Sequence, residues 1–280
     1  MSTIALVGAG GKMGCRIADN LRGSPDDLHY VEVSTQGIAN LAERGLVPTA
    51  QDEAVAHADA VILAVPDHLI GRIAGGIAPH LPSGAMLILL DPAAAHVGDL
   101  PSRADITYFV VHPCHPPLFA DNPNAAARRD YFGGVAAPQN LVCALAQGHD
   151  EAYEHGVALA RRMFAPVLDA YPVSVEQMAL LEPGLTETTM ATCLTVIREA
   201  MDEVIRRGVP PDAARAFLLG HLNIELAIIF GAVSSPFSDG ALIAIERAKG
   251  VLFQPDWKRV FEPANIRESV QVITRGGVNS

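Results

Sequence analysis

Lysine is scarce in this sequence, whose 280 residues include only Lys12, Lys249 and Lys258. Twenty Lys and Arg residues stand against 31 Asp and Glu residues, which gives a net charge of −11 at pH 7. Nucleic-acid binding depends on clustered basic side chains that neutralise phosphates. The composition therefore argues against a nucleic-acid partner.

The sequence also lacks cysteine pairs and long apolar runs. Its four cysteines are widely scattered, with no CxxC pair, which is typical of a reducing cytosol rather than a disulfide framework. The longest apolar candidate for a membrane span, LLGHLNIELAIIFGAV, is interrupted by His221, Asn223 and Glu225. The N-terminal stretch MSTIALVGAGGK has no basic n-region of a signal peptide. We therefore expect a cytoplasmic protein without a membrane partner.

Short apolar runs alternate with amphipathic stretches in the first part of the chain, which predicts strands separated by helices. The predicted strands are Ile4–Val7, Tyr30–Val33, Ala60–Val65, Met86–Leu90, Ile106–Val111 and Val167–Tyr171. Crossover helices between strands imply a parallel sheet. From Val175 on, the pattern is helical. The sequence thus predicts an α/β fold: a Rossmann-type, doubly wound parallel sheet in residues 1–173, followed by an all-helical domain in residues 174–280.

The first predicted strand runs directly into the glycine-rich stretch GAGGKMG. Three of its glycines are spaced GxxGxxG, and Gly10 is an additional one. Glycines permit a tight turn and close backbone approach, while the following helix presents its N-terminus to a pyrophosphate. We expect this loop to bind a dinucleotide through Gly8, Gly10, Gly11, Lys12, Met13 and Gly14.

Two carboxylates are placed to contact the same dinucleotide. Glu32 lies near the end of the second strand, where a carboxylate can accept hydrogen bonds from a ribose diol, although Ser34 could serve equally well. Neither Arg nor Lys occurs between Gly23 and Glu43 to hold a 2′-phosphate, which favours NAD over NADP. Asp67 follows the third strand, where it can cap the next helix and also meet the dinucleotide.

The stretch HPCHPP, residues 112–117, directly follows the predicted strand Ile106–Val111 and contains two histidines. His112 and His115 should emerge at the carboxyl edge of the sheet, where open α/β folds place their chemistry. Residues before prolines favour extended geometry, and a polyproline-like course would put the two side chains roughly 9 Å apart on one side. That spacing favours one imidazole on a metal and the other as an acid–base or binding group. A turn at Pro113-Cys114 could instead bring both to one ion.

The helical half contains LLEPGLTET, where Pro183 and Gly184 directly follow Glu182 and predict an interrupted or kinked helix. A carboxylate at a broken helix is well placed to bind a cation. Glu187 lies five positions on, about 140° around a regular helix, and would share the ion only if the break reorients it. Because no lysine occurs between Glu182 and Lys249, we expect histidines to be the groups that transfer protons in catalysis.

The segment DAARAFLLGHLNIELAIIFGAV is apolar almost all round, which predicts a buried helix. On it, His221 and Glu225 form an i,i+4 pair for which a buried structural role is favoured over a role in a site. The helical domain by itself is too short and too apolar to be self-sufficient. We therefore expect it to be buried against a second subunit, in a homodimer.

Five stretches together resemble the D-apionate oxidoisomerase family: GAGGKMG, TYFVVHPCHPP, DYFGG, VEQMALLEPGLTET and AMDEVIRRGVPPDAARAFLLGH. That family belongs to the 6-phosphogluconate dehydrogenase and ketol-acid reductoisomerase-like group of NAD(P)-dependent enzymes, and the resemblance covers nearly the whole chain. It implies an NAD-dependent oxidoreductase that oxidises the 2-hydroxyl of a branched sugar acid, D-apionate. The resemblance further implies that the carbon skeleton then rearranges to 3-oxo-isoapionate with the help of a divalent metal.

For this reaction we expect His112, His115 and Glu182 to be catalytic. His112 or His115 would take the hydroxyl proton, while His115 and Glu182 would bind the metal, zinc rather than magnesium because an imidazole takes part. A simple NAD(P)-dependent β-hydroxyacid-type dehydrogenase without rearrangement is the alternative. A dinucleotide-binding protein without catalysis is a further one, and a phosphate-binding enzyme would have only Arg128 and Arg129 for its pocket.

Overall fold

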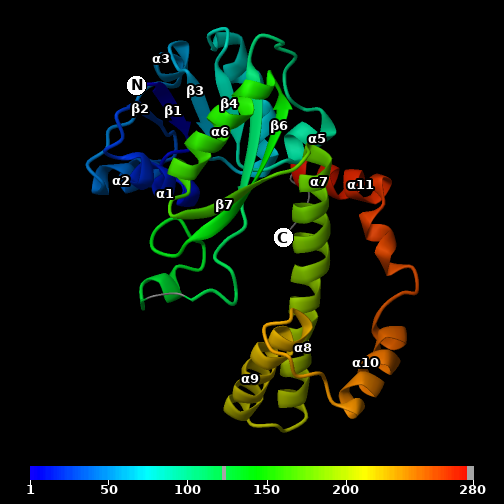
Figure 1. Cartoon of the computed structure of the whole chain (residues 1–280). Coiled ribbons are helices and arrows are strands. Elements are labelled where there is room, and N and C mark those ends of the chain that lie inside the picture. The colour runs from blue at the N-terminus through cyan, green and yellow to red at the C-terminus, as the bar shows by residue number, and fades with distance from the viewer. Residues whose placement is uncertain (122–123, 276–280) are drawn as a thin grey trace. The chain divides into compact units, whose positions relative to one another are not determined.

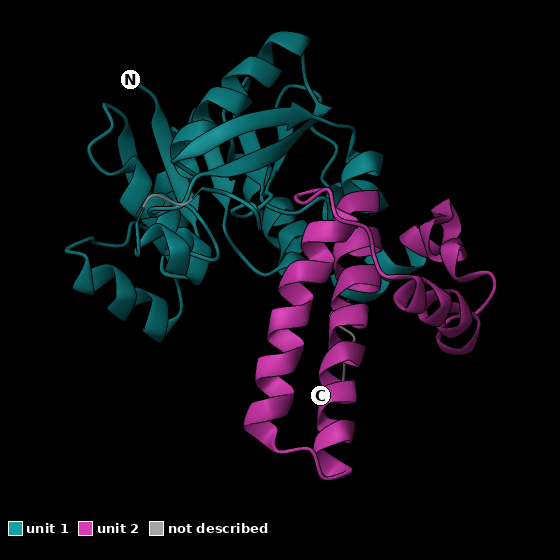
Figure 2. Cartoon of the chain, turned by 60° about the horizontal axis from the view of Figure 1, so that its bottom comes forward, with its two compact units in different colours: residues 1–179, 267–280 teal, residues 180–266 magenta. Residues whose placement is uncertain are grey.

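The computed structural model of the chain describes residues 1–121 and 124–275, which form two compact units (Figures 1 and 2). Unit 1 comprises residues 1–179 together with the chain from Arg267 on, and unit 2 comprises residues 180–266. The sequence suggested a single boundary between residues 173 and 174. The two units instead place α7 (Val175–Ala179) and most of α11 (Pro263–Thr274) with the sheet.

Unit 1 is built on a seven-stranded sheet with the order β2-β1-β3-β4-β5-β6-β7. The strands are β1 (Thr3–Val7), β2 (Asp27–Val31), β3 (Ala60–Leu63), β4 (Met86–Leu89), β5 (Thr107–Pro113), β6 (Gln139–Gln147) and β7 (Val167–Pro172). The pairs among β1 to β5 are parallel, as predicted, whereas β6 runs antiparallel to β5. The described part of the β5–β6 connection contains no α-helix that could cross over the sheet, and antiparallel neighbours need none.

Helices pack on both faces of this sheet (Figure 1). They are α1 (Lys12–Leu21), α2 (Thr35–Glu43), α3 (Gln51–Ala56), α4 (Asp67–Ile77), α5 (Ala93–Val97) and α6 (Asp150–Met163). Successive strand residues enter two different buried clusters: Leu63 packs in the cluster that contains Ile70 of α4, and Ile62 in the cluster that contains Ile17 of α1. Burial on both faces explains why the central strands are continuous apolar runs in the sequence.

The strand order reverses at β1, because β2 lies on one side of it and β3 on the other. The glycine-rich loop leaves β1 at this point, and α1 begins at Lys12 with Gly11 as its N-cap. Doubly wound sheets bind ligands outside the carboxyl ends of their strands at such a reversal. The structure thus confirms the Rossmann-type fold, and it places the glycine loop at the edge where a dinucleotide is expected.

The secondary-structure elements of unit 2 are all helical, and turns and loops connect them. These elements are the π-helix η3 (Leu180–Ala191), α8 (Thr192–Arg206), α9 (Pro211–Ile229), α10 (Asp239–Leu252), the 3₁₀-helix η4 (Trp257–Phe261) and the start of α11.

At Pro183 the α-helical geometry is interrupted as predicted, but the helix does not break, because it continues between α7 and α8 as η3. In an α-helix the proline ring would clash with the carbonyl four residues earlier, and the i→i+5 pattern of a π-helix avoids that register. The hydroxyls of Thr186 and Thr189 donate to the carbonyls of Leu181 and Gly184, at 2.9 and 3.0 Å, each five residues earlier.

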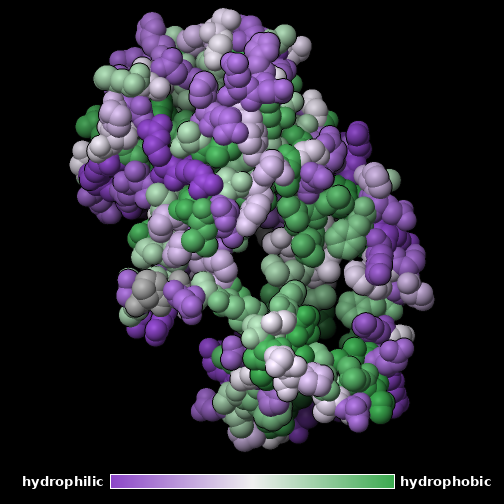
Figure 3. Space-filling view, in the orientation of Figure 1, coloured by the Kyte–Doolittle hydropathy of each residue, from purple (hydrophilic) through white to green (hydrophobic). Residues whose placement is uncertain are grey.

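Few side chains of unit 2 are buried, and the single chain does not bury α9; its burial against a second subunit stays a prediction. Only Ala214 and Ala227 of α9 are buried, whereas Phe217 is 69% and Ile229 60% exposed. Figure 3 shows apolar surface over the helices of this unit.

Within residues 1–121 and 124–275, none of the helices combines the length and the apolar character needed to cross a bilayer.

Phe109 of β5 is fully buried where α6 packs on the sheet: its ring centre lies 5.9 Å from that of Tyr153, and a Cβ on Gly156 would overlap the ring. Substitution Phe109→Ala leaves a cavity, so we expect the free energy of unfolding to fall by about 3–5 kcal/mol in chemical denaturation. The half-exposed Phe119 provides the matched control, since Phe119→Ala should change it by no more than about 0.5 kcal/mol. Equal effects of the two substitutions would contradict this packing.

Candidate active site

The glycine loop is held in close contact with two neighbouring segments. Gly8 has a φ of +78°, and a Cβ at this position would overlap the carbonyl oxygen of Ala64 after β3. A Cβ at Gly10 would overlap the backbone of Gly37 in α2, so this glycine is required by close packing and is not merely an additional one. The tight loop leaves the N-terminus of α1 open to an anion, which fits the pyrophosphate of a dinucleotide.

Glu32 directly follows β2, which ends at Val31 rather than at the predicted Val33. One carboxylate oxygen accepts the N–H of Gly10 at 3.0 Å, and the other accepts those of Val33 and Ser34 at 2.9 and 2.8 Å. Burial raises the pKa of Glu32, but these hydrogen bonds outweigh it and hold the pKa below 4.5. The ionised carboxylate therefore ties the glycine loop to the start of α2, and its remaining acceptor capacity fits a ribose hydroxyl.

Asp67 is the first residue of α4, and Pro66 occupies the N-cap, so the prediction that Asp67 caps this helix was wrong by one position. Its carboxylate in the first turn still interacts favourably with the helix dipole. Asp67 also lines a cavity of about 200 Å³ with His68, Arg72 and Asp99. Contact between Asp67 and the dinucleotide stays a prediction.

His112 and His115 lie at the end of β5, on the carboxyl edge that also carries the glycine loop. The polyproline-like course was wrong, because pairing with β6 extends the strand and the N–H of Cys114 donates to the carbonyl of Asn140 at 2.9 Å. The chain turns at His115, whose φ of +60° is rare for any residue other than glycine. The two imidazole centres are 6.4 Å apart, with the rings nearly perpendicular.

Both imidazoles are fixed through Nδ1 by backbone carbonyls. His112 Nδ1 lies 2.9 Å from the oxygen of Leu90, and His115 Nδ1 lies 3.0 Å from that of Phe132. Since a carbonyl can only accept a hydrogen bond, Nδ1 carries the proton in each case, and Nε2 carries the lone pair of the neutral ring. Proteins set the tautomer of catalytic and metal-binding histidines in this way.

Phe132 contacts His115, and Arg16 forms an ion pair with Asp130, which lies close to Phe132 in the sequence; the sequence analysis gave none of these three residues a role. Phe132 supplies the carbonyl, its ring centre lies 5.8 Å from that of His115, and its face lies 3.0 Å from Lys12 Nζ. The carboxylate of Asp130 accepts a hydrogen bond from Arg16 of α1 at 3.1 Å. Arg16 and Asp130 are 114 positions apart, so no local sequence pattern could have revealed the pair.

Glu182 lies in the first turn of η3, in unit 2. The i→i+5 pattern of the π-helix places residues five positions apart on the same side, so Glu187 lies on the side of Glu182 without a break in the helix. Within residues 1–121 and 124–275, no group of three or more His, Cys, Asp and Glu side chains is arranged to hold a metal ion. The metal ligands His115 and Glu182 stay a prediction.

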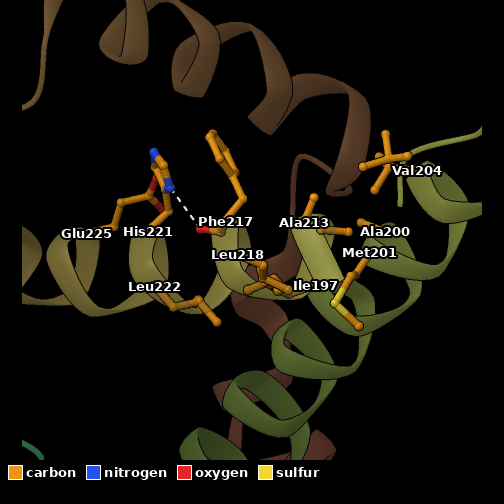
Figure 4. A pocket seen from close by; sticks show the side chains of 12 residues that line it. Ile197, Ala200, Met201, Val204, Ala213, Phe217, Leu218, His221, Leu222 and Glu225 are labelled. Carbon is orange, nitrogen blue, oxygen red and sulfur yellow. Dashed lines mark hydrogen bonds between the residues drawn. The ribbon is translucent and has the colours of Figure 1, made fainter. Parts of the chain in front are cut away.

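Unit 2 also carries an apolar groove of about 620 Å³ between α8 and α9 (Figure 4). The ring of His221 stacks on that of Phe217 with centres 3.9 Å apart, and its Nδ1 donates to the Phe217 carbonyl at 2.8 Å. Glu225 and aliphatic side chains line the remainder of the groove. Both His221 and Glu225 are exposed, so the single chain does not provide the buried structural pair that the sequence favoured.

Two protein families match the chain over more than half of its length each. Residues 1–165 match the family described as acetohydroxy acid isomeroreductase, NADPH-binding domain. Residues 120–274 match the family described as phosphogluconate dehydrogenase (decarboxylating) C-term. The two matches together cover nearly the whole chain and agree with a sheet domain followed by helices.

Curated relatives named D-apionate oxidoisomerase match over almost the full length. The protein from Rhizobium rhizogenes is 52% identical, over 98% of this chain and 100% of its own. The protein from Cupriavidus necator is 53% identical, over 97% of this chain and 99% of its own.

A solved structure from Cupriavidus necator is described as a semialdehyde dehydrogenase NAD-binding protein in complex with calcium and NAD. It is 52% identical to this chain, with a TM-score of 0.95 over 98% of this chain and 100% of that one. Because it is 52–53% identical to these curated relatives over nearly its full length, this chain belongs to the D-apionate oxidoisomerase family, within the 6-phosphogluconate dehydrogenase and ketol-acid reductoisomerase-like group.

Proposed function

We propose that this protein is an NAD-dependent oxidoisomerase that converts D-apionate to 3-oxo-isoapionate. The substrate is that of the curated relatives, which are at least 52% identical over 97% or more of the chain. The structural observation that carries the proposal is the pair of imidazoles with fixed Nδ1 protons at the carboxyl edge of the sheet. The same edge carries the glycine loop, so acid–base groups and a dinucleotide site belong to one compact unit.

The residues around the glycine loop fit NAD. The tight loop opens the N-terminus of α1 to a pyrophosphate, and the ionised Glu32 fits a ribose diol while repelling a 2′-phosphate. The relative from Cupriavidus necator was solved with NAD bound. When bound, NAD accepts the hydride that leaves C2 of the sugar acid.

His112 and His115 are the proposed acid–base groups. In each, the lone pair on Nε2 is directed by the Nδ1–H bond to a carbonyl, so Nε2 of one ring takes the proton of the substrate hydroxyl. The positive φ of His115 supports a functional assignment, because a strained backbone persists where the surroundings hold it and concentrates at active sites.

The rearrangement requires a polarised ketone and a neighbouring alkoxide held beside it, which a divalent cation supplies when bound. We propose His115 and Glu182 as protein ligands of that cation, with zinc favoured because an imidazole takes part. The Nδ1–H···O=C bond of His115 supports this, since metal-binding histidines have such partners. The calcium in the Cupriavidus necator structure supports a cation, although calcium prefers oxygen ligands.

A cytoplasmic location and a homodimer complete the proposal. The four cysteines are widely scattered and include no CxxC pair, which supports a reducing compartment. The apolar side chains exposed on α8, α9 and α10 exceed the scattered ones usual for a monomer, and such a surface marks an interaction site. We propose that a second copy of the chain covers this surface.

Incubation with D-apionate and NAD should produce NADH, and NMR should identify 3-oxo-isoapionate as the product. With EDTA present, the rearranged product should be lost because the ketone is no longer polarised. A 2-keto acid with an unrearranged skeleton, formed equally well in EDTA, would instead identify a simple dehydrogenase.

His115→Ala and Glu182→Ala extend this assay, with His221→Ala as a histidine control in unit 2. The first two should lower both the bound metal, measured by elemental analysis, and the turnover, by at least about 10-fold. Full metal content and full turnover in either variant would remove that residue from the metal site.

Glu32→Gln should lower the preference for NAD over NADP, measured as the ratio of the two kcat/KM values, because the repulsion of a 2′-phosphate is lost.

Glu32→Gln should also change the pH dependence of stability. The depressed pKa of Glu32 stabilises the fold above about pH 4.5, and this contribution is lost as the pH falls through the folded pKa. The difference in Tm between the parent and Glu32→Gln should therefore shrink below about pH 4.5, and a constant difference would contradict this assignment.

Light scattering should give about twice the chain mass of 29.6 kDa. Phe217→Asp, on the exposed surface of α9, should shift the protein toward the monomer because a charge would be buried in the interface. Val47→Asp is the matched control, since Val47 is 78% exposed on unit 1 and should leave the mass unchanged. A monomeric parent protein would disprove the dimer.

A further inference from the structure

Asp130 is a buried carboxylate with an unusually full set of partners. One oxygen accepts the backbone N–H groups of Val135, Ala136 and Ala137, at 3.1, 2.8 and 3.1 Å. The other accepts the guanidinium of Arg16 at 3.1 Å, and the residue is 8% exposed. Burial raises the pKa of Asp130, but the hydrogen bonds outweigh it and keep the pKa below its usual value. An ionised carboxylate therefore closes the segment 130–137 into a fixed loop.

The same loop is attached to α1 at two further points. Arg16 also donates to the carbonyl of Gly133, and Asn20 donates to that of Gly134 at 2.9 Å. Gly133 and Gly134 have φ values of +70° and +76°, which let their carbonyls turn toward the helix. The loop thus takes its position from the helix that begins at the glycine loop.

Phe132 lies within this loop and makes the contact with the active-site histidine. Its carbonyl accepts the Nδ1–H of His115 at 3.0 Å, and its ring meets the His115 ring edge-on with centres 5.8 Å apart. The face of the same ring lies 3.0 Å from Lys12 Nζ, a cation–π contact with the first residue of α1. The tautomer of His115 therefore depends on a carbonyl whose place is set by Asp130 and α1.

We propose that Asp130 is a positioning residue for His115: it holds the Phe132 carbonyl so that Nδ1 keeps the proton and Nε2 carries the reactive lone pair. The catalytic part of this inference rests on the proposed function of His115. The positioning part does not, since it concerns the tautomer of the ring. The Nδ1 of His112 is bonded to the carbonyl of Leu90, which lies outside the loop.

The test is ¹⁵N NMR of protein labelled at histidine, in which two-bond correlations show which ring nitrogen carries the proton, combined with turnover of D-apionate. In the parent protein, both His112 and His115 should be protonated at Nδ1 when neutral. Asp130→Ala should release His115 from that tautomer and leave His112 unchanged. The kcat should fall by about 10- to 100-fold, as for loss of other partners of functional histidines, with little change in the KM for NAD.

Asp26 supplies a matched control, since its side chain is 5% exposed, pairs with Arg162 and accepts the N–H of Ser2 at 3.0 Å. Asp26→Ala removes a comparable ion pair of unit 1 and should leave the His115 tautomer and kcat as in the parent. If Asp130→Ala does not fold, Arg16→Gln should weaken the Nδ1 tautomer of His115 in the same direction, to a smaller extent.

The outcomes separate the two proposals. A parent His115 protonated at Nε2, or a tautomer unmoved in Asp130→Ala, overturns the positioning role even if kcat falls. A tautomer that shifts in Asp130→Ala supports the positioning role. If His115→Ala then retains full activity, positioning stands and the proposed catalytic function of His115 fails.

Discussion

The hydrogen bond from His115 Nδ1 to the carbonyl of Phe132 is the interaction on which the chemistry of this site depends. It decides which ring nitrogen can accept a proton or a cation, and a loop held by α1 supplies its acceptor. Because α1 begins at the glycine loop, the proposed coenzyme site and the proposed support of His115 share one helix.

Two carboxylates of unit 1 perform the same physical task at different loops. Glu32 and Asp130 each accept three backbone N–H groups, and in each the hydrogen bonds outweigh the effect of burial on the pKa. Loops with several N–H groups pointing inward need such an acceptor, since an unpaired buried N–H is costly. We propose a second role for Glu32, since its negative charge would repel the 2′-phosphate of NADP and so favour NAD.

Local patterns in the sequence were sufficient for every strand of the described sheet except β6, for the glycine loop, and for the placement of His112 and His115 at the sheet edge. They failed where a distant partner decides the conformation. Pairing with β6 keeps residues 112–114 extended, and the packing of α2 makes Gly10 obligatory. The interruption or kink expected at Pro183 takes the form of a π-helix, η3, which proline rules based on the α-helix do not anticipate. The Arg16–Asp130 pair has no local signal at all.

The apolar character of α9 shows why periodicity alone cannot assign burial. A helix that is apolar all round can be buried in the core of its own chain or against a partner chain, and the two kinds of burial require the same apolar sequence pattern. The exposure of Phe217 and Ile229 excludes the first possibility within the described chain. Hydrophobic surface of this kind is unfavourable in water at about 25 cal/mol per Å², so a helical unit with so few buried side chains needs a covering surface. A second copy provides the same apolar helices, and a two-fold arrangement would let each cover the other.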